Sequence, residues 1–381
     1  MHSTYFTPDH DTFRASVRRF VEQEVAPQAD AWESERRIPR GIFRRMGELG
    51  FLGILHPPEV GGAGGDLFHA VAFLEELPRS RMGGFCAAVA VQQFMADRHI
   101  WAHGSEEQKR RWVVPSIEGR AVGALAVTEP DAGSDVAALR TRAERHDGGW
   151  RIEGAKTFIT NGADGDFFTL AAKTAPDKGA AGISLFVVPA DTPGVRVNRR
   201  LEKLGWHCCD TAELSFEDVR LPADALVGEE HAGFRYLMEG FQLERLCSAA
   251  LAVGSALLCL EETLAYARDR KAFGRPLVKF QTMSHRLAEL ATVTEAARQL
   301  TLHAAWLLEH DHPAVRECSM AKLYATETAK RVADECLQCY GGYGLMEEYP
   351  AARFFRDARP HTIVAGTSEI MREIIARLMV G

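Results

Sequence analysis

The sequence has no excess of basic residues, and this absence argues against one large class of proteins. Its 381 residues include 45 Lys and Arg against 52 Asp and Glu, which gives a formal net charge of −7. Proteins that hold nucleic acid by its phosphate backbone depend on basic patches. We therefore expect no nucleic-acid partner.

A clear membrane-spanning run and a recognisable leader are also lacking. The uncharged stretch Leu246–Leu260 holds 15 residues, short of the roughly 20 that a bilayer requires. The first residues, which soon reach Asp9 and Asp11, have neither a basic n-region nor an apolar h-region. We expect a protein without a membrane span, located in the cytoplasm.

Cysteine is present but lacks the spacing of a disulfide framework or a metal site. The eight Cys residues suggest a reducing compartment. Cys336 and Cys339 fall within a helical pattern and have no second pair or His cluster at zinc spacing. We expect these two side chains to pack in the core and predict no metal site.

A dinucleotide fingerprint is missing as well. The glycine cluster at 61–65 follows Pro57 and Pro58, and no predicted strand precedes it. Such a fingerprint needs a strand before its glycines and a helix after them. The cluster is therefore interpreted as a plain loop.

What the sequence does contain is a change of pattern along its length. Up to about residue 120, apolar side chains such as Val17, Phe20 and Val21 recur at helical spacing. Short β-type runs then follow, and helical stretches return after Gly233. We predict a helical domain over 1–120, a β-domain over 121–233 and a helical domain over 234–381. The last is expected to hold helices at roughly 234–270, 280–310, 314–340 and 367–379.

The sequence pattern of the middle region predicts short strands without intervening helices. The β-type runs lie at 121–128, 167–172, 183–188 and 211–219. In the last run Ala212, Leu214 and Phe216 alternate with polar residues, which indicates a half-buried strand. Strands that follow one another directly favour an antiparallel sheet. The predicted fold class is α+β, mainly α.

A single carboxylate stands out in the first helical stretch of the third region. Between Gly240 and Leu260 only Glu244 and Arg245 carry charge, and a helix apolar nearly all round is buried. Adjacent residues on a helix do not face each other, so Arg245 is poorly placed to neutralise Glu244. Burial disfavours the ionised carboxylate, which prepares a general base to act near neutral pH. A purely structural role stays open, because ion-pair networks also place carboxylates in cores.

Three further segments combine glycine with hydroxyl or acidic side chains. They are Ala126–Asp135 after a predicted strand, Gln338–Leu345 between helices, and Ala365–Glu369 at the start of the last helix. Backbone N–H groups and hydroxyls in such turns suit a polar cofactor, and a helix N-terminus suits an anion.

These segments resemble the acyl-CoA dehydrogenase family. Both of its long signature patterns match, at 126–138 and 338–357, and residues 154–162, Arg270–Arg275 and Gln281 match as well. The resemblance covers essentially the whole chain. It implies an N-terminal helical domain, a middle antiparallel β-domain and a C-terminal four-helix bundle.

The family binds FAD outside any Rossmann fold, so the resemblance implies FAD as the cofactor. It places Phe158 and Thr160 beside the isoalloxazine ring. Arg270, Phe273 and Gln281 would reach the FAD of a neighbouring subunit, as would Gln338, Gly341 and Gly342, which implies a homo-oligomer, with a tetramer expected. The implied flavin contacts are Val127, Thr128, Gly133, Ser134, Phe158, Thr160, Arg270, Phe273, Phe280, Gln281, Gln338, Gly341, Gly342, Thr367 and Glu369.

At one position the sequence departs from the common pattern. Most members carry the catalytic Glu immediately before the Gly-Thr pair of the last motif, where this chain has Ala365. The isovaleryl and long-chain acyl-CoA dehydrogenases instead carry the base on the first helix of the C-terminal domain, directly before an Arg. Glu244 and Arg245 match that arrangement. The resemblance implies Glu244 as the base, Ala365 as a backbone N–H donor only, and Ser134, Arg245 and Gly366 as substrate contacts.

The implied reaction is the FAD-dependent α,β-dehydrogenation of an acyl-CoA thioester to the trans-2-enoyl-CoA, a step of fatty acid oxidation. The substrate would be of medium or long chain, or branched, and an electron-transferring flavoprotein would accept the electrons. Two alternatives stay open at this point, because a fold does not determine one activity. They are a flavin-dependent monooxygenase or oxidase, and a dehydrogenase of acyl-carrier-protein thioesters.

Overall fold

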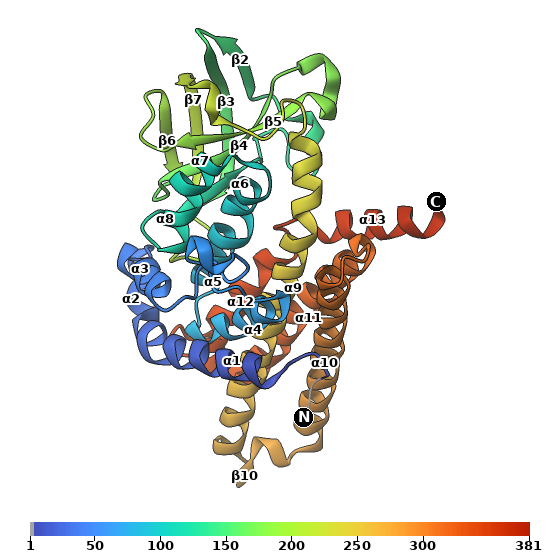
Figure 1. The fold of residues 1–381 in the computed structure, drawn as a ribbon. Helices are drawn as coiled ribbons and strands as arrows, with labels where there is room; N and C mark the ends of the chain where they lie inside the picture. Colours follow the sequence, from blue (N-terminus) through green and yellow to red (C-terminus); the bar gives the residue numbers. More distant parts are fainter. Residues whose placement is uncertain (1–3) are drawn as a thin grey trace.

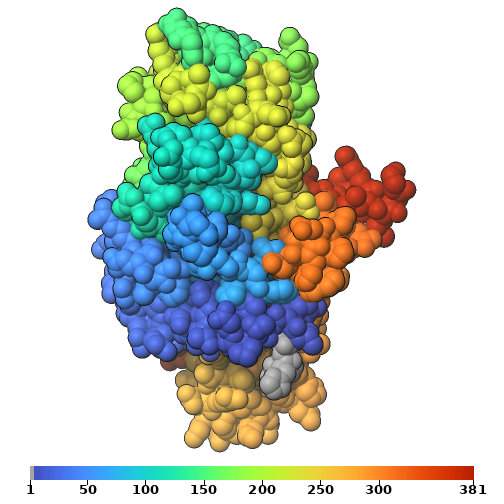
Figure 2. Space-filling model, in the orientation of Figure 1, coloured from blue at the N-terminus to red at the C-terminus, as the bar shows by residue number. Residues whose placement is uncertain are grey.

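The computed structural model describes residues 4–381 and shows three regions that follow one another along the molecule (Figure 1). A β-sheet lies at one end, the N-terminal helices cover the middle, and long C-terminal helices run to the other end. Figure 2 shows that two parts project from this body: the segment that follows helix α9 (Gly233–Asp269), and the last helix, α13 (Ser368–Val380).

The N-terminal region consists of short helices, as its periodicity predicts. Two of its faces become buried, one against the C-terminal helices and one against the sheet. Its α-helices are α1 (Pro8–Phe20), α2 (Ala29–Glu35), α3 (Arg40–Glu48), α4 (Leu67–Glu76), α5 (Gly83–Val91), α6 (Asp97–His103), α7 (Glu106–Gln108) and α8 (Val114–Ile117).

The middle region is one eight-stranded sheet with the order β6-β7-β3-β2-β4-β5-β8, and β1 pairs with β4. Each of the four runs expected from the sequence forms a strand. The strands are β1 (Gly123–Ala126), β2 (Arg142–His146), β3 (Gly149–Thr160), β4 (Phe167–Lys173), β5 (Ile183–Pro189), β6 (Val195–Arg200), β7 (Thr211–Leu221) and β8 (Leu226–Val227).

The sheet is mixed, whereas the sequence predicted antiparallel pairing. Strand β1 runs parallel to β4, with Gly123 opposite Phe167, and β2 and β4 are parallel at their single shared residue pair. The parallel β1–β4 pairing is possible because the long segment between the two strands includes the β2–β3 hairpin, which gives the chain room to return in the same direction.

The C-terminal helices form where the sequence predicted them. They are α9, α10 (Gln281–Glu309), α11 (Val315–Tyr340) and α13, and a further helix, α12 (Pro350–His361), was not predicted. A two-stranded hairpin of β9 (Lys271–Ala272) and β10 (Arg275–Pro276) joins α9 to α10.

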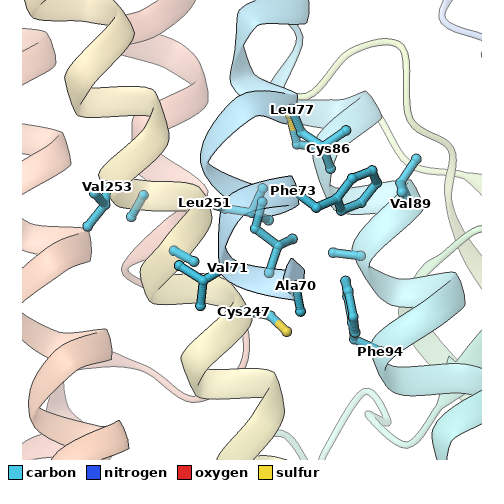
Figure 3. Close-up of a cluster of buried hydrophobic side chains, with 14 of the residues drawn as sticks. Ala70, Val71, Phe73, Leu77, Cys86, Val89, Phe94, Cys247, Leu251 and Val253 are labelled. Carbon is cyan, nitrogen blue, oxygen red and sulfur yellow. The ribbon is translucent and has the colours of Figure 1, made fainter. Parts of the chain in front are cut away.

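The main hydrophobic core lies between the N-terminal and the C-terminal helices. Figure 3 shows α4, with Val71 and Phe73, between α9, with Cys247 and Leu251, and α5, with Val89. Helix α9 packs on α4, α10 and α11, and its N-terminal part also packs on the sheet side. This central position explains why the helix is apolar on nearly all sides.

Within residues 4–381, α9 is the single helix that is long and apolar enough to cross a membrane. Its most apolar 18-residue window has a mean hydropathy of 1.6, and 78% of that window is buried inside the fold. Such burial is typical of the core helix of a globular protein.

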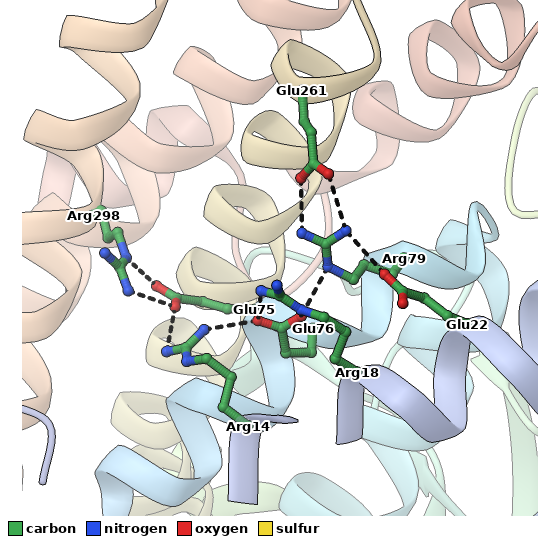
Figure 4. A network of polar contacts seen from close by, with 8 residues as sticks. All are labelled: Arg14, Arg18, Glu22, Glu75, Glu76, Arg79, Glu261 and Arg298. Carbon is green, nitrogen blue, oxygen red and sulfur yellow. Dashed lines mark hydrogen bonds and ion pairs between the residues drawn. The ribbon is translucent and has the colours of Figure 1, made fainter. Parts of the chain in front are cut away.

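A buried network of Arg and Glu ties the helices together behind this core (Figure 4). Glu75 and Glu76, at the end of α4, have buried side chains. Arg14 of α1 contacts Glu75 at 2.7 Å and Glu76 at 3.0 Å. Arg298 of α10 contacts Glu75 at 2.8 Å, and Arg18 of α1 contacts Glu76 at 2.8 Å. The two carboxylates therefore hold α1, α4 and α10 in one arrangement.

We predict that Glu76→Gln destabilises the fold by about 3 kcal/mol, because it leaves buried cations without their partner. Burial alone would raise the pKa of Glu76, but the hydrogen bond and charge of Arg18 and the charge of Arg14 outweigh it, so the pKa lies below its usual value. The stabilisation is then present above the ordinary carboxyl pKa and is lost as the pH falls through the lowered one.

Thermal unfolding of the wild type and the variant at neutral and acidic pH checks this. The difference in melting temperature is expected to be largest near neutral pH and to shrink in acid. Glu106→Gln, which removes an exposed carboxylate paired with Lys109, is the control and should change little. Equal effects of the two substitutions would contradict the prediction.

Candidate active site

The carboxylate of Glu244 lies on α9 at the level where that helix passes the N-terminal helices. The residue is 5% exposed, as its position in an apolar stripe predicted. Its neighbour Arg245 is also buried, yet the two form no ion pair within the described part of the chain. Burial lowers the pKa of Arg245, and the nearby charge of Glu244 opposes that effect.

Polar atoms without a hydrogen-bond partner are concentrated on this stretch of α9. Among the described residues, Glu244 Oε1, Arg245 Nε and Ser248 Oγ are buried and make no hydrogen bond, and neither does Nε2 of His99 on the facing helix α6. Buried polar atoms are nearly always satisfied in folded proteins. A group of them at one place therefore indicates a site that a polar ligand completes.

The loop before α13 has a backbone conformation unusual for its residues. Ala365 has φ +52° and Gly366 has φ +91°, both in the left-handed region. At Gly366 the positive φ would strain any other residue, and a Cβ there would also lie 2.7 Å from Cε of Met371. The N–H of Ala365 meets no acceptor within residues 4–381, and this leaves it available as a donor.

The side chain of Lys322, on α11, forms a hydrogen bond with this loop. Its Nζ donates a 2.5 Å hydrogen bond to the carbonyl oxygen of Gly366, and its side chain is fully buried. Burial, together with the nearby charge of Arg245, lowers the pKa of Lys322 to about 8. Helix α11 packs on both α9 and α13, so Lys322 joins the loop to the helix that lies against α9.

At the start of α13, Thr367 is the N-cap residue, with its side chain accepting from the N–H of Ile370 at 3.3 Å. Glu369 follows in the first turn. Hydrogen bonds from its own N–H and from Thr367 lower the pKa of this exposed carboxyl. The helix N-terminus thus lies next to Gly366, as the motif predicted.

Phe158 presents an aromatic ring on the surface of the sheet. The residue has φ +59° and lies between Lys156 and Ile159, where the register of β3 against β7 shifts. A bulge of this kind re-aims a side chain, and Phe158 is 67% exposed. An exposed aromatic ring on a strained backbone suits a flat apolar ligand such as a flavin ring.

A buried ion pair joins β3 to the segment that carries Val127 and Thr128. The Nζ of Lys156 lies 2.7 Å from Glu129 and donates to the carbonyl of Val127 at 3.0 Å. The N–H of Thr157 donates to the carbonyl of Thr128 at 2.9 Å. Two segments that the sequence assigned to the flavin are therefore side by side.

The remaining predicted residues of this region lie nearby in the chain. Gly133 and Ser134 are exposed in the turn after β1, and no atom lies within 4 Å of a Cβ built on Gly133. Thr160 ends β3 opposite Thr211 of β7.

The structure does not bring the other predicted flavin residues to this place. Phe273 is 97% exposed between β9 and β10, at the end of the molecule opposite the sheet (Figure 1). Arg270 lies with its guanidinium 5.2 Å from the ring of Tyr343, close to the exposed Gly341 and Gly342 in sequence. Gln338 lies one turn earlier on α11. Phe280 is the N-cap residue of α10, which begins at Gln281. These residues form a second group, which we call the distal group.

Three buried residues of the site were missed at the sequence level. His99, Lys322 and Lys156 have no spacing motif that marks them, because each meets its partner across a large distance in the chain. The only available signal was the presence of Lys156 in the matched segment 154–162.

Two other polar features lie away from this site. A pocket of about 470 Å³ is formed around the network of Figure 4 and includes Arg14 and Arg298. His10, Asp66 and His69 are ligand-type residues whose atoms lie within 4.8 Å of one another. Their atoms hydrogen-bond to each other and cap α1 and α4, so we assign them a structural role.

Comparison with known proteins gives matches along nearly the whole chain. Family models match as the N-terminal, middle and C-terminal domains of acyl-CoA dehydrogenase, at residues 7–120, 124–219 and 231–380. The chain belongs to the acyl-CoA dehydrogenase family. This confirms the resemblance inferred from the sequence, together with the fold, the activity on an acyl-CoA substrate and FAD as the cofactor.

Individual relatives of this acyl-CoA dehydrogenase agree with the assignment. The mitochondrial long-chain specific acyl-CoA dehydrogenase of Sus scrofa is 42% identical over 98% of this chain and 87% of its own. The crystal structure of an acyl-CoA dehydrogenase from Geobacillus kaustophilus has a TM-score of 0.96 and 41% identity over 100% of both chains. A glutaryl-CoA dehydrogenase from Mycobacterium smegmatis, solved with FADH2, has a TM-score of 0.94 and 31% identity over 99% of this chain and 96% of its own.

We predict that Lys322→Met slows the reduction of bound flavin by acyl-CoA about tenfold to a hundredfold. The carbonyl of Gly366 loses its donor, so the loop relaxes and the N–H of Ala365 is no longer held in place. Anaerobic stopped-flow absorbance measures the rate. Lys330→Met, which removes an exposed lysine of the same helix, should leave the rate unchanged, and an unchanged rate in Lys322→Met would contradict the prediction.

Proposed function

We propose that Glu244 is the catalytic base with which this acyl-CoA dehydrogenase removes the α-proton of its substrate. The observation that carries the proposal is the buried carboxylate without a hydrogen-bond partner on α9. By the resemblance, Ala365 occupies the position at which most members of the family carry their base, and its methyl side chain cannot accept a proton. Glu244 is the carboxylate that we propose to accept the α-proton instead.

The backbone of the loop before α13 is suited to stabilise the negative charge that forms when the α-proton is removed. The α-proton of a thioester is weakly acidic, so negative charge that develops on the carbonyl oxygen needs a donor placed in advance. The unpaired N–H of Ala365 supplies one, and Lys322 holds the loop in the conformation that exposes it. When bound, FAD supplies the acceptor for the β-hydrogen, which leaves as hydride.

Further residues bind and orient the reactants. Arg245, buried with its Nε unpaired, is proposed to attract the thioester or the CoA arm, and Ser134 and Gly366 to contact the substrate. Val127, Thr128 and Ser134, which follow β1, and Phe158 of β3 are proposed to hold the flavin. The hydrophobic core around α9 keeps bulk water away from the base.

We predict that Glu244→Gln abolishes substrate-driven bleaching of the flavin, because an amide cannot take the proton. FAD content and acyl-CoA binding should persist, since the two side chains have nearly the same shape. Anaerobic titration with acyl-CoAs of different chain lengths measures both. Glu239→Gln, on the same helix with its carboxylate half exposed, is the matched control and should bleach like the wild type. Full bleaching by Glu244→Gln would place the base elsewhere.

The same titration tests which acyl-CoA is the substrate, and reoxidation of the reduced enzyme tests which electron acceptor it uses. We propose a medium- or long-chain or branched acyl-CoA, which the 42% identity with a long-chain specific relative supports, and an electron-transferring flavoprotein as acceptor. The reduced enzyme should then be slow with oxygen and fast with that flavoprotein. Fast reoxidation by oxygen would instead indicate an oxidase or monooxygenase, and bleaching by acyl-carrier-protein thioesters alone would indicate a different carrier.

We further propose that the protein is a homo-oligomer, a tetramer, in which each subunit completes the flavin site of its neighbour. The distal group and the sheet lie at opposite ends of one chain (Figure 1), so one subunit cannot apply both to the same flavin. The matched family ranges support the proposed division of the chain into domains at 1–120, 121–233 and 234–381. We also keep the cytoplasm as the proposed location.

We predict that co-expressed Glu244→Gln and Arg270→Ala subunits regain activity that neither variant has alone. If Arg270 contacts the flavin of the neighbouring subunit, a mixed pair contains one complete site. In that site the Arg270→Ala subunit contributes Glu244, and the Glu244→Gln subunit contributes Arg270. Random pairing then restores about one quarter of the wild-type rate. Differently tagged subunits, purified in tandem and assayed for flavin reduction, measure it. No recovery in mixed oligomers would show that Arg270 acts within its own chain or not at all.

A further inference from the structure

We propose that His99 is a positioning residue for the base, which holds the carboxylate of Glu244 in its ionised form on α9. This inference rests on the proposed role of Glu244 and adds a second side chain to that site. His99 does not exchange a proton with the substrate. It acts through the carboxylate that it faces.

The contact joins two helices far apart in the sequence. Nε2 of His99, on α6, lies 3.8 Å from Oε1 of Glu244, on α9. The two side chains are 2% and 6% exposed, so bulk water does not screen them. Neither atom has a hydrogen-bond partner within residues 4–381. A small rotation of either side chain would close the gap to a hydrogen bond, which makes each the natural partner of the other.

The imidazole of His99 packs against α9 at a position where that helix has a glycine. Gly240 precedes Glu244 by four residues and so lies on the same face of the helix. A Cβ at Gly240 would lie 2.5 Å from Cε1 of His99 and 3.2 Å from its Nε2. Any larger residue at 240 would therefore displace the ring. Helix α9 thus has no side chain at position 240, where the imidazole of His99 packs, and carries the carboxylate of Glu244 one turn later.

The charged side chain next to this contact is Arg245 of α9, which is buried and forms no ion pair within residues 4–381. The charge of Glu244 is felt at Arg245, so Arg245 also faces this carboxylate. On α6, Asp97 is bonded to Ser116 of α8, and His103 is stacked on Tyr236 and lies 3.4 Å from Glu239. Both contacts are made with residues other than Glu244.

Further charged groups lie on the elements packed against α6. Arg110 pairs with Glu107, and the guanidinium of Arg111 lies 4.9 Å from the ring of Trp112. Arg235 of α9 pairs with Glu239, and Lys109, which follows α7, pairs with Glu106. Arg98 is buried beside Asp97, and burial lowers its pKa while the charges of Asp97 and Glu239 oppose that effect. Lys173 ends β4, and β8 carries no charged residue.

The chemical consequence concerns the pH at which the base becomes available. An N–H directed at a carboxylate stabilises the ionised form relative to the protonated form. Without such a donor, a carboxylate buried among apolar side chains is protonated up to a higher pH and cannot accept the α-proton there. His99 therefore extends the working range of the enzyme toward acid. In the reaction the α C–H bond breaks and an O–H bond forms on Glu244, while His99 keeps its own protons.

The test compares His99→Phe, His99→Gln and Gly240→Ala with the wild-type holoenzyme. Phenylalanine fills the same space without a donor, so the acid limb of the pH profile for flavin reduction should move up by about one pH unit. Glutamine restores an N–H and should return the limb toward the wild type. Gly240→Ala displaces the ring and should shift the limb in the same direction as His99→Phe. His103→Gln, one turn away on α6, is the matched control and should leave the profile unchanged.

A second measurement does not depend on turnover. The carboxylic acid C=O band of Glu244, identified in infrared difference spectra by its loss in Glu244→Gln, should titrate at higher pH in His99→Phe. An unmoved band and an unmoved acid limb in His99→Phe and Gly240→Ala would overturn the proposal. These outcomes are separate from the failure of Glu244 as base, which Glu244→Gln reports alone: the band could still shift if the base lay elsewhere.

Discussion

The structure depends on one constraint: the central helix α9 is packed on several sides at once. Because α4, α10 and α11 all contact it, apolar side chains must cover nearly its whole circumference. A charged residue on such a helix is unfavourable unless something compensates it. Glu244 and Arg245 lie in that environment without forming a pair with each other. Their position therefore marks where the protein must admit a ligand, and the rest of the site is arranged around them.

Two groups that we propose to contact the cofactor or the substrate lie on backbone with positive φ. Phe158 is turned outward by a bulge in β3, and Ala365 adopts a left-handed conformation before α13. A buried lysine lies near each of them. Lys322 donates to the carbonyl of Gly366, next to Ala365, and Lys156 donates to the carbonyl of Val127, in the segment paired with Thr157. In the loop before α13, the left-handed segment is therefore supported directly by a buried hydrogen bond.

Predictions from the sequence succeeded where periodicity was strong and failed where it was weak. The long helices and strand β7 were predicted because burial on one or more faces leaves a regular apolar pattern. Strand β3 was missed, since Gly154 and the bulge at Phe158 interrupt its alternation. Strand β6 was missed as well, because at the edge of the sheet its residues are nearly all exposed. The parallel β1–β4 pair depends on the path of the chain between the strands, which no local pattern records.

The sequence by itself determined the family, the order of helices and strands, and the unusual carboxylate at position 244. These follow from composition, spacing and motifs, which are properties of neighbouring residues. Only the tertiary structure decided which side chains face that carboxylate and which predicted flavin contacts lie together. His99 is separated from Glu244 by more than a hundred residues, and the distal group lies at the far end of the molecule. Such contacts arise from the packing of whole helices against each other, and the energy of that packing is not local to any segment.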